Sequence, residues 1–193
     1  MFAMSSTAPR RLELSSLLLA VLFMSTAAWP RSGAAQASRQ EFALGLGPTM
    51  VGVPHFGAGA RGFGGQLGLN YGVTRSWNLA AAANLASLRG RVDEVDVRGR
   101  TASVFSGVAY NVDVLTVVPY VSLMAGWQGG RLADSRASHF GLRAAIGADY
   151  RPSRQWGFGV QIEWHAAFPE VLNYPSETVL WLRAVRYFDL RRF

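Results

Sequence analysis

The sequence of 193 residues contains no cysteine and no lysine, and only 16% of its residues are charged. Without cysteine, the chain has no disulfide framework, no thiolate nucleophile and no Cys-based metal site. The charged share is well below the roughly one quarter that is usual for soluble domains. Outside the N-terminal segment there is no apolar run long enough for a membrane-spanning helix, which argues against a helical membrane protein.

All 19 basic residues are Arg, and the formal net charge is +7. A basic chain can indicate a nucleic-acid partner. Here, however, the arginines are scattered along the chain among strand and turn segments and form no single cluster in the sequence. We therefore expect no binding to nucleic acid.

Residues 1–37 have the three parts of a secretory signal peptide. Two arginines precede a short apolar run, LLLAVLFM at residues 17–24, and the segment AQA at 35–37 has the small-x-small form of a cleavage site. An earlier cut near residues 27–28 stays open. The remaining residues, 38–193, have the length of one domain.

From residue 41 onward, apolar residues alternate with small or polar ones, as expected for strands whose two faces meet different surroundings. In residues 156–165, Trp, Phe, Val, Ile and Trp occupy one face, and Gly, Gln, Glu and His occupy the other. The alternation predicts eight strands, at about residues 41–53, 60–73, 76–88, 99–112, 116–129, 138–151, 154–167 and 177–190. Eight such segments in succession are typical of a transmembrane β-barrel.

The connections between these strands alternate in length. Every second one is a short turn, and the others are mostly longer and rich in Gly, Pro and charged residues, at 54–59, 89–98, 130–137 and 168–176. Outer-membrane barrels have short periplasmic turns and longer outer loops. The sequence thus predicts an all-β fold, a closed antiparallel eight-stranded barrel over 38–193, exported through the periplasm to the outer membrane of a Gram-negative bacterium.

Aromatic residues gather near the strand ends, where amphipathic rings suit the level of the lipid headgroups. The short-turn ends hold Tyr71, Trp77, Tyr110, Tyr120, Tyr150, Trp156, Tyr187 and Phe188. Trp127 and Trp164 lie near the opposite ends. We therefore expect two aromatic girdles, one at each membrane surface.

Three charged residues are predicted to point into the barrel from neighbouring strands: Arg143, Glu163 and Arg183. Eight strands leave an interior just wide enough for side chains. An unpaired charge in a low-dielectric wall costs several kcal/mol, so we expect these residues to form a charge network in a narrow, side-chain-filled lumen. A register slip of one residue would exchange the two faces.

A soluble lipocalin-like barrel or β-sandwich is the main structural alternative. In that fold the larger apolar face would point inward to a core. It would explain a signal peptide equally well, but it does not explain the alternation of short and long connections.

Three features resemble the small outer-membrane β-barrel superfamily, which holds OmpX-like and OmpA-like barrels and other porin-family β-barrel domains. They are the strand–turn–strand segment at 71–79, the segment at 118–126 and the C-terminal Phe193. The resemblance covers about residues 40–193 and implies recognition of a C-terminal aromatic residue by the barrel-assembly machinery. The chain departs from the family's apolar pattern before the end, at Asp189 and Arg191, which favours Phe188 as the effective signal residue.

These observations predict an integral outer-membrane protein with a structural or surface-interaction role and no cofactor. Its expected partners are outer-membrane lipids and lipopolysaccharide, and the sequence assigns no oligomeric state. The charged segment 89–100 reads as a solvated outer loop, or as an Arg-rich contact for lipopolysaccharide phosphates or a neighbouring cell surface. The alternative function is a small porin-like channel for ions or small solutes.

A third class, an envelope enzyme that modifies lipid A, needs a reactive site. Ser138, His139, His165 and Glu163 suggest a hydrolase triad such as some outer-membrane barrels carry, but Ser138 and His139 are adjacent and face opposite sides of a regular strand. Two histidines also lack a clear third metal ligand. We therefore predict no enzyme and no catalytic, cofactor or metal site.

Overall fold

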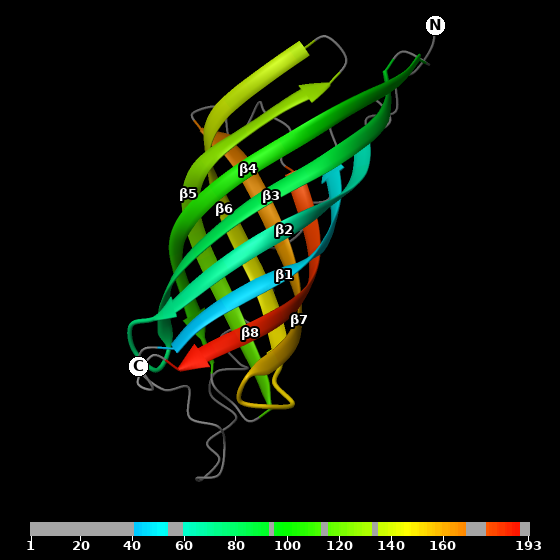
Figure 1. Ribbon diagram of the computed structural model, residues 1–193. Helices are drawn as coiled ribbons and strands as arrows, with labels where there is room; N and C mark the ends of the chain where they lie inside the picture. The colour runs from blue at the N-terminus through cyan, green and yellow to red at the C-terminus, as the bar shows by residue number, and fades with distance from the viewer. Residues whose placement is uncertain are drawn as a thin grey trace, which may run out of the picture. The chain divides into compact units, whose positions relative to one another are not determined.

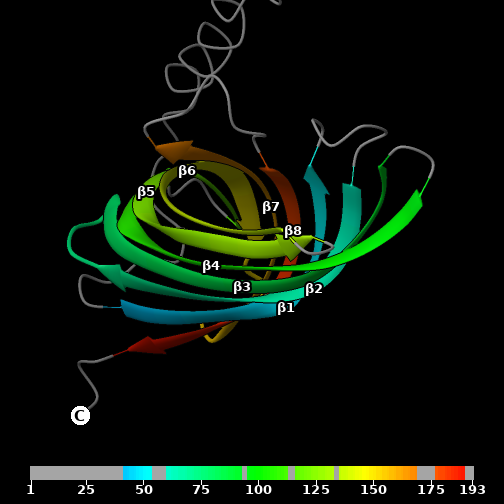
Figure 2. The same ribbon diagram turned by 90° about the horizontal axis from the view of Figure 1, so that it is seen from above.

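The computed structural model describes residues 41–53, 60–92, 95–112, 116–132, 135–168 and 177–189. They form eight strands, β1 Glu41–Val53, β2 Ala60–Gly72, β3 Trp77–Val92, β4 Val95–Asn111, β5 Val117–Leu132, β6 Ser135–Tyr150, β7 Trp156–Phe168 and β8 Glu177–Asp189. Each strand pairs antiparallel with the next, and β1 also pairs with β8, so the sheet is a closed barrel (Figures 1 and 2). The predicted fold class is confirmed.

Among these residues there is no helix long and apolar enough to cross a membrane.

Closure of the barrel depends on the pairing of the first and last strands. Register partners run from Glu41 opposite Asp189 to Gly52 opposite Thr178. A sheet in hydrocarbon must pair its backbone N–H and C=O groups within itself, because lipid offers no partner. Closure removes the two free edges that an open sheet would leave.

The two faces of the barrel have opposite character. Large apolar side chains point outward, and Leu46, Phe63 and Leu85 are 64%, 70% and 69% exposed. Polar side chains point inward, and Gln66 and Glu163 are 2% and 1% exposed. A soluble barrel would show the reverse arrangement, so the lipocalin-like alternative is wrong.

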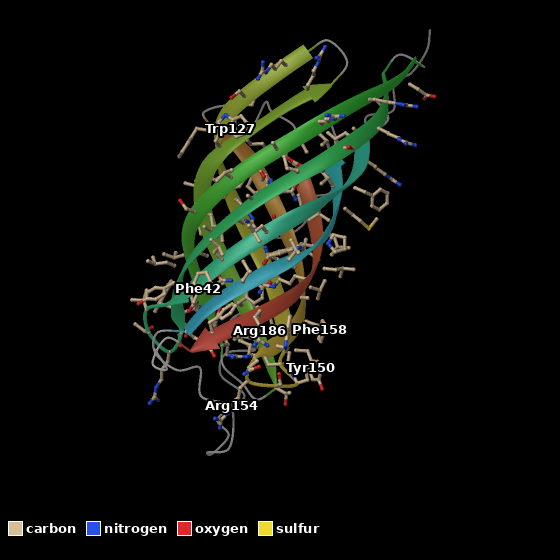
Figure 3. The ribbon with its side chains drawn as sticks, in the orientation of Figure 1. Phe42, Trp127, Tyr150, Arg154, Phe158 and Arg186 are labelled. Carbon is tan, nitrogen blue, oxygen red and sulfur yellow. The ribbon has the colours of Figure 1, made fainter. Side chains whose placement is uncertain are left out.

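Exposed aromatic residues form the two expected girdles. Trp127 lies toward the hairpin end of the barrel, the end that carries the long β3–β4 and β5–β6 hairpins. Tyr150 and Phe158 lie near the opposite, short-turn end (Figure 3). The expectation fails for Tyr120 and Tyr187, whose hydroxyl groups bond to side chains inside the barrel. A position near a strand end does not determine which face a side chain occupies.

Strands β3 to β6 are longer than the sequence predicted. The segments expected as loops at 89–98 and 130–137 are mostly strand, and pairing continues to Val92 opposite Val95 and to Leu132 opposite Ser135. These hairpins reach beyond the end of β1 (Figure 1). The alternation of apolar residues did not predict this extension, because a strand that continues beyond the membrane needs no apolar face and can carry charged residues.

Two of the short turns are held by hydroxyl groups. Thr74 Oγ1 accepts the backbone N–H groups of Ser76 and Trp77 at 3.3 and 3.0 Å. Ser153 Oγ does the same for the second and third residues after it. Such contacts stabilise turns locally. The expected signal peptide, the segment 54–59, most of 168–176 and Phe193 lie outside the described residues.

Candidate functional site: the barrel interior and the outer arginine rows

Glu163 is the centre of a buried hydrogen-bond network. Its Oε1 lies 2.5 Å from Arg143 Nη2 on the neighbouring strand and accepts the side-chain amides of Gln66 and Gln161, each at 2.6 Å. Its Oε2 lies 3.0 Å from His165 Nε2. Arg143 and Glu163 are each 1% exposed. A buried carboxylate is tolerable when it has a counter-charge and donors of this kind.

The network reaches most of the barrel wall. Asn84 of β3 donates to Gln66 Oε1 at 3.0 Å and to Thr49 Oγ1 of β1 at 3.3 Å. Tyr120 of β5 donates its hydroxyl to Gln161 Oε1 at 2.7 Å. Side chains from six strands are thus linked across the interior at this level.

His165 continues the network toward the hairpin end. Its Nδ1 lies 3.7 Å from Glu177 Oε2, and its ring packs 5.0 Å from the ring of Phe105. Gln128 donates to the same Glu177 oxygen. Alternation does not predict this role of Glu177, because the residue lies at the start of a strand, where alternation is hardest to assign.

Arg183 does not join Glu163. Its guanidinium binds Asp149 through two hydrogen bonds, Nε to Oδ1 at 3.0 Å and Nη2 to Oδ2 at 2.7 Å, and Tyr187 donates to the same carboxylate at 3.2 Å. Its charge also faces the ring of Tyr120 at 4.6 Å. The three residues expected in one network thus divide between two, Arg143 with Glu163 and Arg183 with Asp149. Alternation along the strand places Asp149 on the same inner face as Arg143, and this could have identified Asp149 as the partner of Arg183.

Trp181 lies between these two clusters along β8. It is 1% exposed, and its ring extends across Gly45 of β1 and Gly68 of β2. A Cβ atom added at these glycines would lie 3.2 and 2.6 Å from Trp181 Cη2. The two glycines therefore make room for this indole inside the barrel.

A pocket opens at the short-turn end of the interior. Glu41 and Arg151 line it and form a salt bridge of 3.0 Å, and Arg151 also stacks 3.7 Å from the centre of the Tyr187 ring. Further lining residues are Asn70, Asn78, Asn111 and Arg75. Arg183 and Asp149 also line this pocket.

Of the residues considered for catalysis, Ser138 is separated from the hydrogen-bonded pair of Glu163 and His165. Ser138 is exposed on the outer face, where its hydroxyl accepts the indole N–H of Trp127 at 2.6 Å. His165 and Glu163 are buried in the interior. Within the described ranges, no group of three or more His, Asp or Glu residues is placed to hold a metal ion.

Six arginines form two rows on the outer face, near the hairpin end. In one row Arg61, Arg89 and Arg98 face one another in register on β2, β3 and β4. In the other row the register partners are Arg100, Arg131 and Arg136 on β4, β5 and β6. All six side chains are exposed. Residues that appear scattered in the sequence are gathered by strand pairing, so the expectation of dispersed arginines is wrong at this surface.

A closed barrel with an apolar exterior and a hydrogen-bonded polar interior defines the class of small outer-membrane β-barrels. The sequence matches the model of the family "Outer membrane protein beta-barrel domain" over residues 15–174, and the chain belongs to this family. None of the curated proteins matches the chain in sequence.

Solved structures of small barrels share the fold. Ail, the attachment invasion locus protein of Yersinia pestis, is 16% identical with a TM-score of 0.57, covering 78% of this chain and 100% of its own. Neisserial surface protein A is 14% identical with a TM-score of 0.59, covering 81% and 98%. OprG of Pseudomonas aeruginosa is 11% identical with a TM-score of 0.58, covering 81% and 99%. The likeness is one of fold.

Proposed function

We propose that this chain is an integral protein of the outer membrane of a Gram-negative bacterium, with a closed lumen and a structural or surface-interaction role. Residues 1–37 direct export as a signal peptide, and residues 38–193 form the barrel domain. The barrel-assembly machinery inserts it, reading the aromatic residue near its C-terminus.

The observation that carries the closed lumen is the position of Trp181. Its ring fills the space above Gly45 and Gly68, between the Glu163 cluster and the Arg183–Asp149 pair. A continuous water path would require this ring to move, and would also require the Glu163 hydrogen bonds to break. Breaking the Glu163 contacts gives up hydrogen bonds to a charged group, each worth about 1.5–3 kcal/mol.

The surface role is supported by what the outer face offers. Its apolar band suits lipid, and six exposed arginines lie toward the hairpin end. We propose outer-membrane lipids and lipopolysaccharide as its partners, because guanidinium groups bind phosphate well. Ail has been crystallised in complex with a heparin analogue, sucrose octasulfate; sulfated glycans are therefore the second class of anion to compare.

A channel is the competing function. The pocket at the short-turn end and the polar interior favour it, since both would accept water or small ions. An enzyme has less support. Among the described residues, Glu163 and His165 are buried in the interior, and Ser138 faces away from them.

Single-channel conductance of the refolded mature chain, residues 38–193, tests the closed lumen. We expect a folded, inserted protein without discrete conductance steps. Trp164→Ala, which changes an exposed outer-face indole, should behave in the same way. Reproducible steps from the wild-type chain would contradict the proposal and favour the channel. Failure of the chain to insert into bilayers would contradict its place in the membrane.

A further inference from the structure

One arginine lies on the lipid-facing side of the barrel within its apolar band. Arg186 of β8 stands directly opposite Trp156 of β7 and Leu44 of β1, and residues directly opposite each other share one face of a sheet. Trp156 is 47% exposed on the outer face, so Arg186 faces outward too. Among the described strand residues that face outward between the middle of the barrel and the short turns, Arg186 is the only charged one.

Aromatic rings hold Arg186 in this position. Its Cζ lies 4.9 Å from the centre of the Trp156 ring and 5.9 Å from that of Phe188, which stands two residues further along the same face of β8. Phe188 in turn packs 6.0 Å from Phe42 of β1. The guanidinium therefore lies on an aromatic surface that β7, β8 and β1 build together. Ring faces attract a cation, and these contacts use none of its five N–H donors.

This surface lies at the boundary between hydrocarbon and headgroups. Trp156 is the first residue of β7, directly after the turn that joins β6 to β7. Tyr150 and Phe158, which are register partners across these strands, are exposed at the same end of the barrel. Figure 3 shows both of them and Arg186 at the short-turn end, with Arg154 further toward the turns. Such aromatic residues mark the interface of a membrane.

A second corner of the barrel has the same construction without the arginine. Trp77 is the first residue of β3 and follows a turn held by Thr74 Oγ1, as β7 follows a turn held by Ser153 Oγ. The residue opposite Trp77 is Tyr110, and the two rings pack edge to face 5.1 Å apart. An aromatic pair is thus sufficient to complete the girdle at such a corner. Arg186 places a cation where this corner has its second ring, which indicates a different role.

The surroundings of Arg186 limit what can bind its N–H groups. The side chain is half-buried against its neighbours. Hydrocarbon offers no acceptor, and a donor withdrawn from water without a partner costs free energy. Besides water, the acceptors at the interface are the phosphate and ester oxygens of phospholipids. A guanidinium can bind phosphate through two parallel hydrogen bonds, and stacking on a ring leaves the N–H groups at its edge available for them.

We infer that Arg186 binds the phosphodiester group of a phospholipid in the periplasmic leaflet of the outer membrane. This inference rests on the proposed function, which places the barrel in that membrane, and on the periplasmic side of short turns in such barrels. Arg154 is exposed in the turn two residues before Trp156. It lies on the headgroup side of Arg186 (Figure 3) and adds a second positive charge to the site.

A lipid fits this site better than a water-soluble anion does. Leu182 and Phe158, on the hydrocarbon side of Arg186, are 52% and 57% exposed on the outer face, where acyl chains would lie along them. A phospholipid carries its phosphate at this depth already. A free phosphate ion would have to give up water in order to reach a half-buried group beside hydrocarbon. The position therefore favours a phospholipid over inorganic phosphate.

The test uses the protein isolated from membranes and placed in dodecyl maltoside micelles, which contain no phosphate. The probe is dihexanoyl phosphatidylglycerol, and the comparison probes are dihexanoylglycerol, which lacks the phosphate, and inorganic phosphate. NMR signals of the indole N–H groups report binding at each corner. The Trp156 indole lies against the guanidinium, and the Trp77 indole in the second corner is the internal reference.

Two variants remove the proposed binding group. Arg186→Tyr copies the aromatic pair of Trp77 and Tyr110, and Arg186→Gln removes the charge without adding a ring. The matched control is Arg75→Gln, which removes one exposed charge from the turn before Trp77. Unchanged indole signals of Trp127 and Trp181 show that a variant keeps its fold, and either Arg186 variant is sufficient for the test.

We expect phosphatidylglycerol to shift the Trp156 signal in a saturable way and to leave the Trp77 signal nearly unchanged. In the Arg186 variants the affinity reported by Trp156 should fall at least about tenfold, which corresponds to the loss of one good charge-assisted contact. In Arg75→Gln it should change by less than about twofold, a difference too small for the loss of such a contact. Dihexanoylglycerol should give no saturable shift.

Three results would overturn the inference. Equal shifts of the Trp156 and Trp77 signals would indicate general uptake of lipid by the micelle. Unchanged affinity in a folded Arg186 variant would show that the guanidinium is not the binding group. Binding of inorganic phosphate at the same or a lower concentration would make a water-soluble anion the ligand. None of these results depends on conductance or on insertion into a bilayer, so failure of this inference is distinguishable from failure of the proposed function.

Discussion

Arg143 and Arg183 lie inside the barrel, and the two arginine rows lie on its outer face. Each interior guanidinium has a carboxylate within 2.7 Å, Glu163 for Arg143 and Asp149 for Arg183. In the outer rows, the register partners are other arginines. The same side chain is therefore held by a buried carboxylate inside the barrel, whereas on the outer face it is exposed beside residues of the same charge.

Removal of Glu163 should have the largest effect, because it leaves Arg143 buried without its counter-charge. The remaining polar contact of Arg143 is its 3.5 Å approach to Met124 Sδ. We expect Glu163→Ala to lower the free energy of unfolding by about 3–5 kcal/mol. Equilibrium urea unfolding in phospholipid vesicles measures this. Arg98→Ala, in the outer arginine rows, is the matched control, and its free energy of unfolding should change by less than about 0.5 kcal/mol. Equal losses in the two variants would remove the contrast between inside and outside.

Removal of Arg143, the cation that pairs with Glu163, should lower the free energy of unfolding by a smaller amount. In Arg143→Met, Glu163 keeps Gln66, Gln161 and His165 within 3.0 Å. We expect a loss of about 1.5–3 kcal/mol, the range for hydrogen bonds to a charged group, in the same urea experiment. A loss greater than that of Glu163→Ala would show that the carboxylate depends on Arg143 alone and is not the centre of the cluster.

The packing of Trp181 inside the barrel can be tested by adding one methyl group at a neighbouring glycine. Gly68→Ala places a Cβ 2.6 Å from the Trp181 ring, whereas Gly65→Ala meets its nearest atom at 3.9 Å. Overpacking of a filled core costs about 1–3 kcal/mol, so Gly68→Ala should destabilise the barrel and Gly65→Ala should not. Intrinsic tryptophan fluorescence during urea unfolding follows both. If Gly68→Ala costs as much stability in a Trp181→Ala background as it does in the wild-type chain, the indole is not the cause.

Sequence alternation was sufficient to predict the eight strands and the inward direction of Arg143, Glu163 and Arg183. It could not predict their partners, because these depend on register between strands. Arg143 lies opposite His165 and reaches Glu163 diagonally, whereas Arg183 lies opposite Gly159 and reaches Asp149. The outer arginine rows could not be predicted for the same reason. Arg61, Arg89 and Arg98 are up to 37 positions apart in the sequence. Their proximity can be predicted only when the registers of both strand pairs are known.

The smallest expected effect concerns the outer arginine rows, where a substitution should raise the free energy of unfolding instead of lowering it. Arg89 faces Arg61 on one side and Arg98 on the other. In a membrane without anionic lipid, Arg89→Gln should raise the free energy of unfolding by about 0.2–1 kcal/mol, the range for cross-strand pairs. Urea unfolding at 0.05 M and 1 M salt measures the effect. The gain should shrink at high salt, because the Debye length falls to about 3 Å. A gain independent of salt would mean that repulsion is not its source, whereas a loss of stability at low salt would mean that acidic groups of the protein itself balance the charge of Arg89.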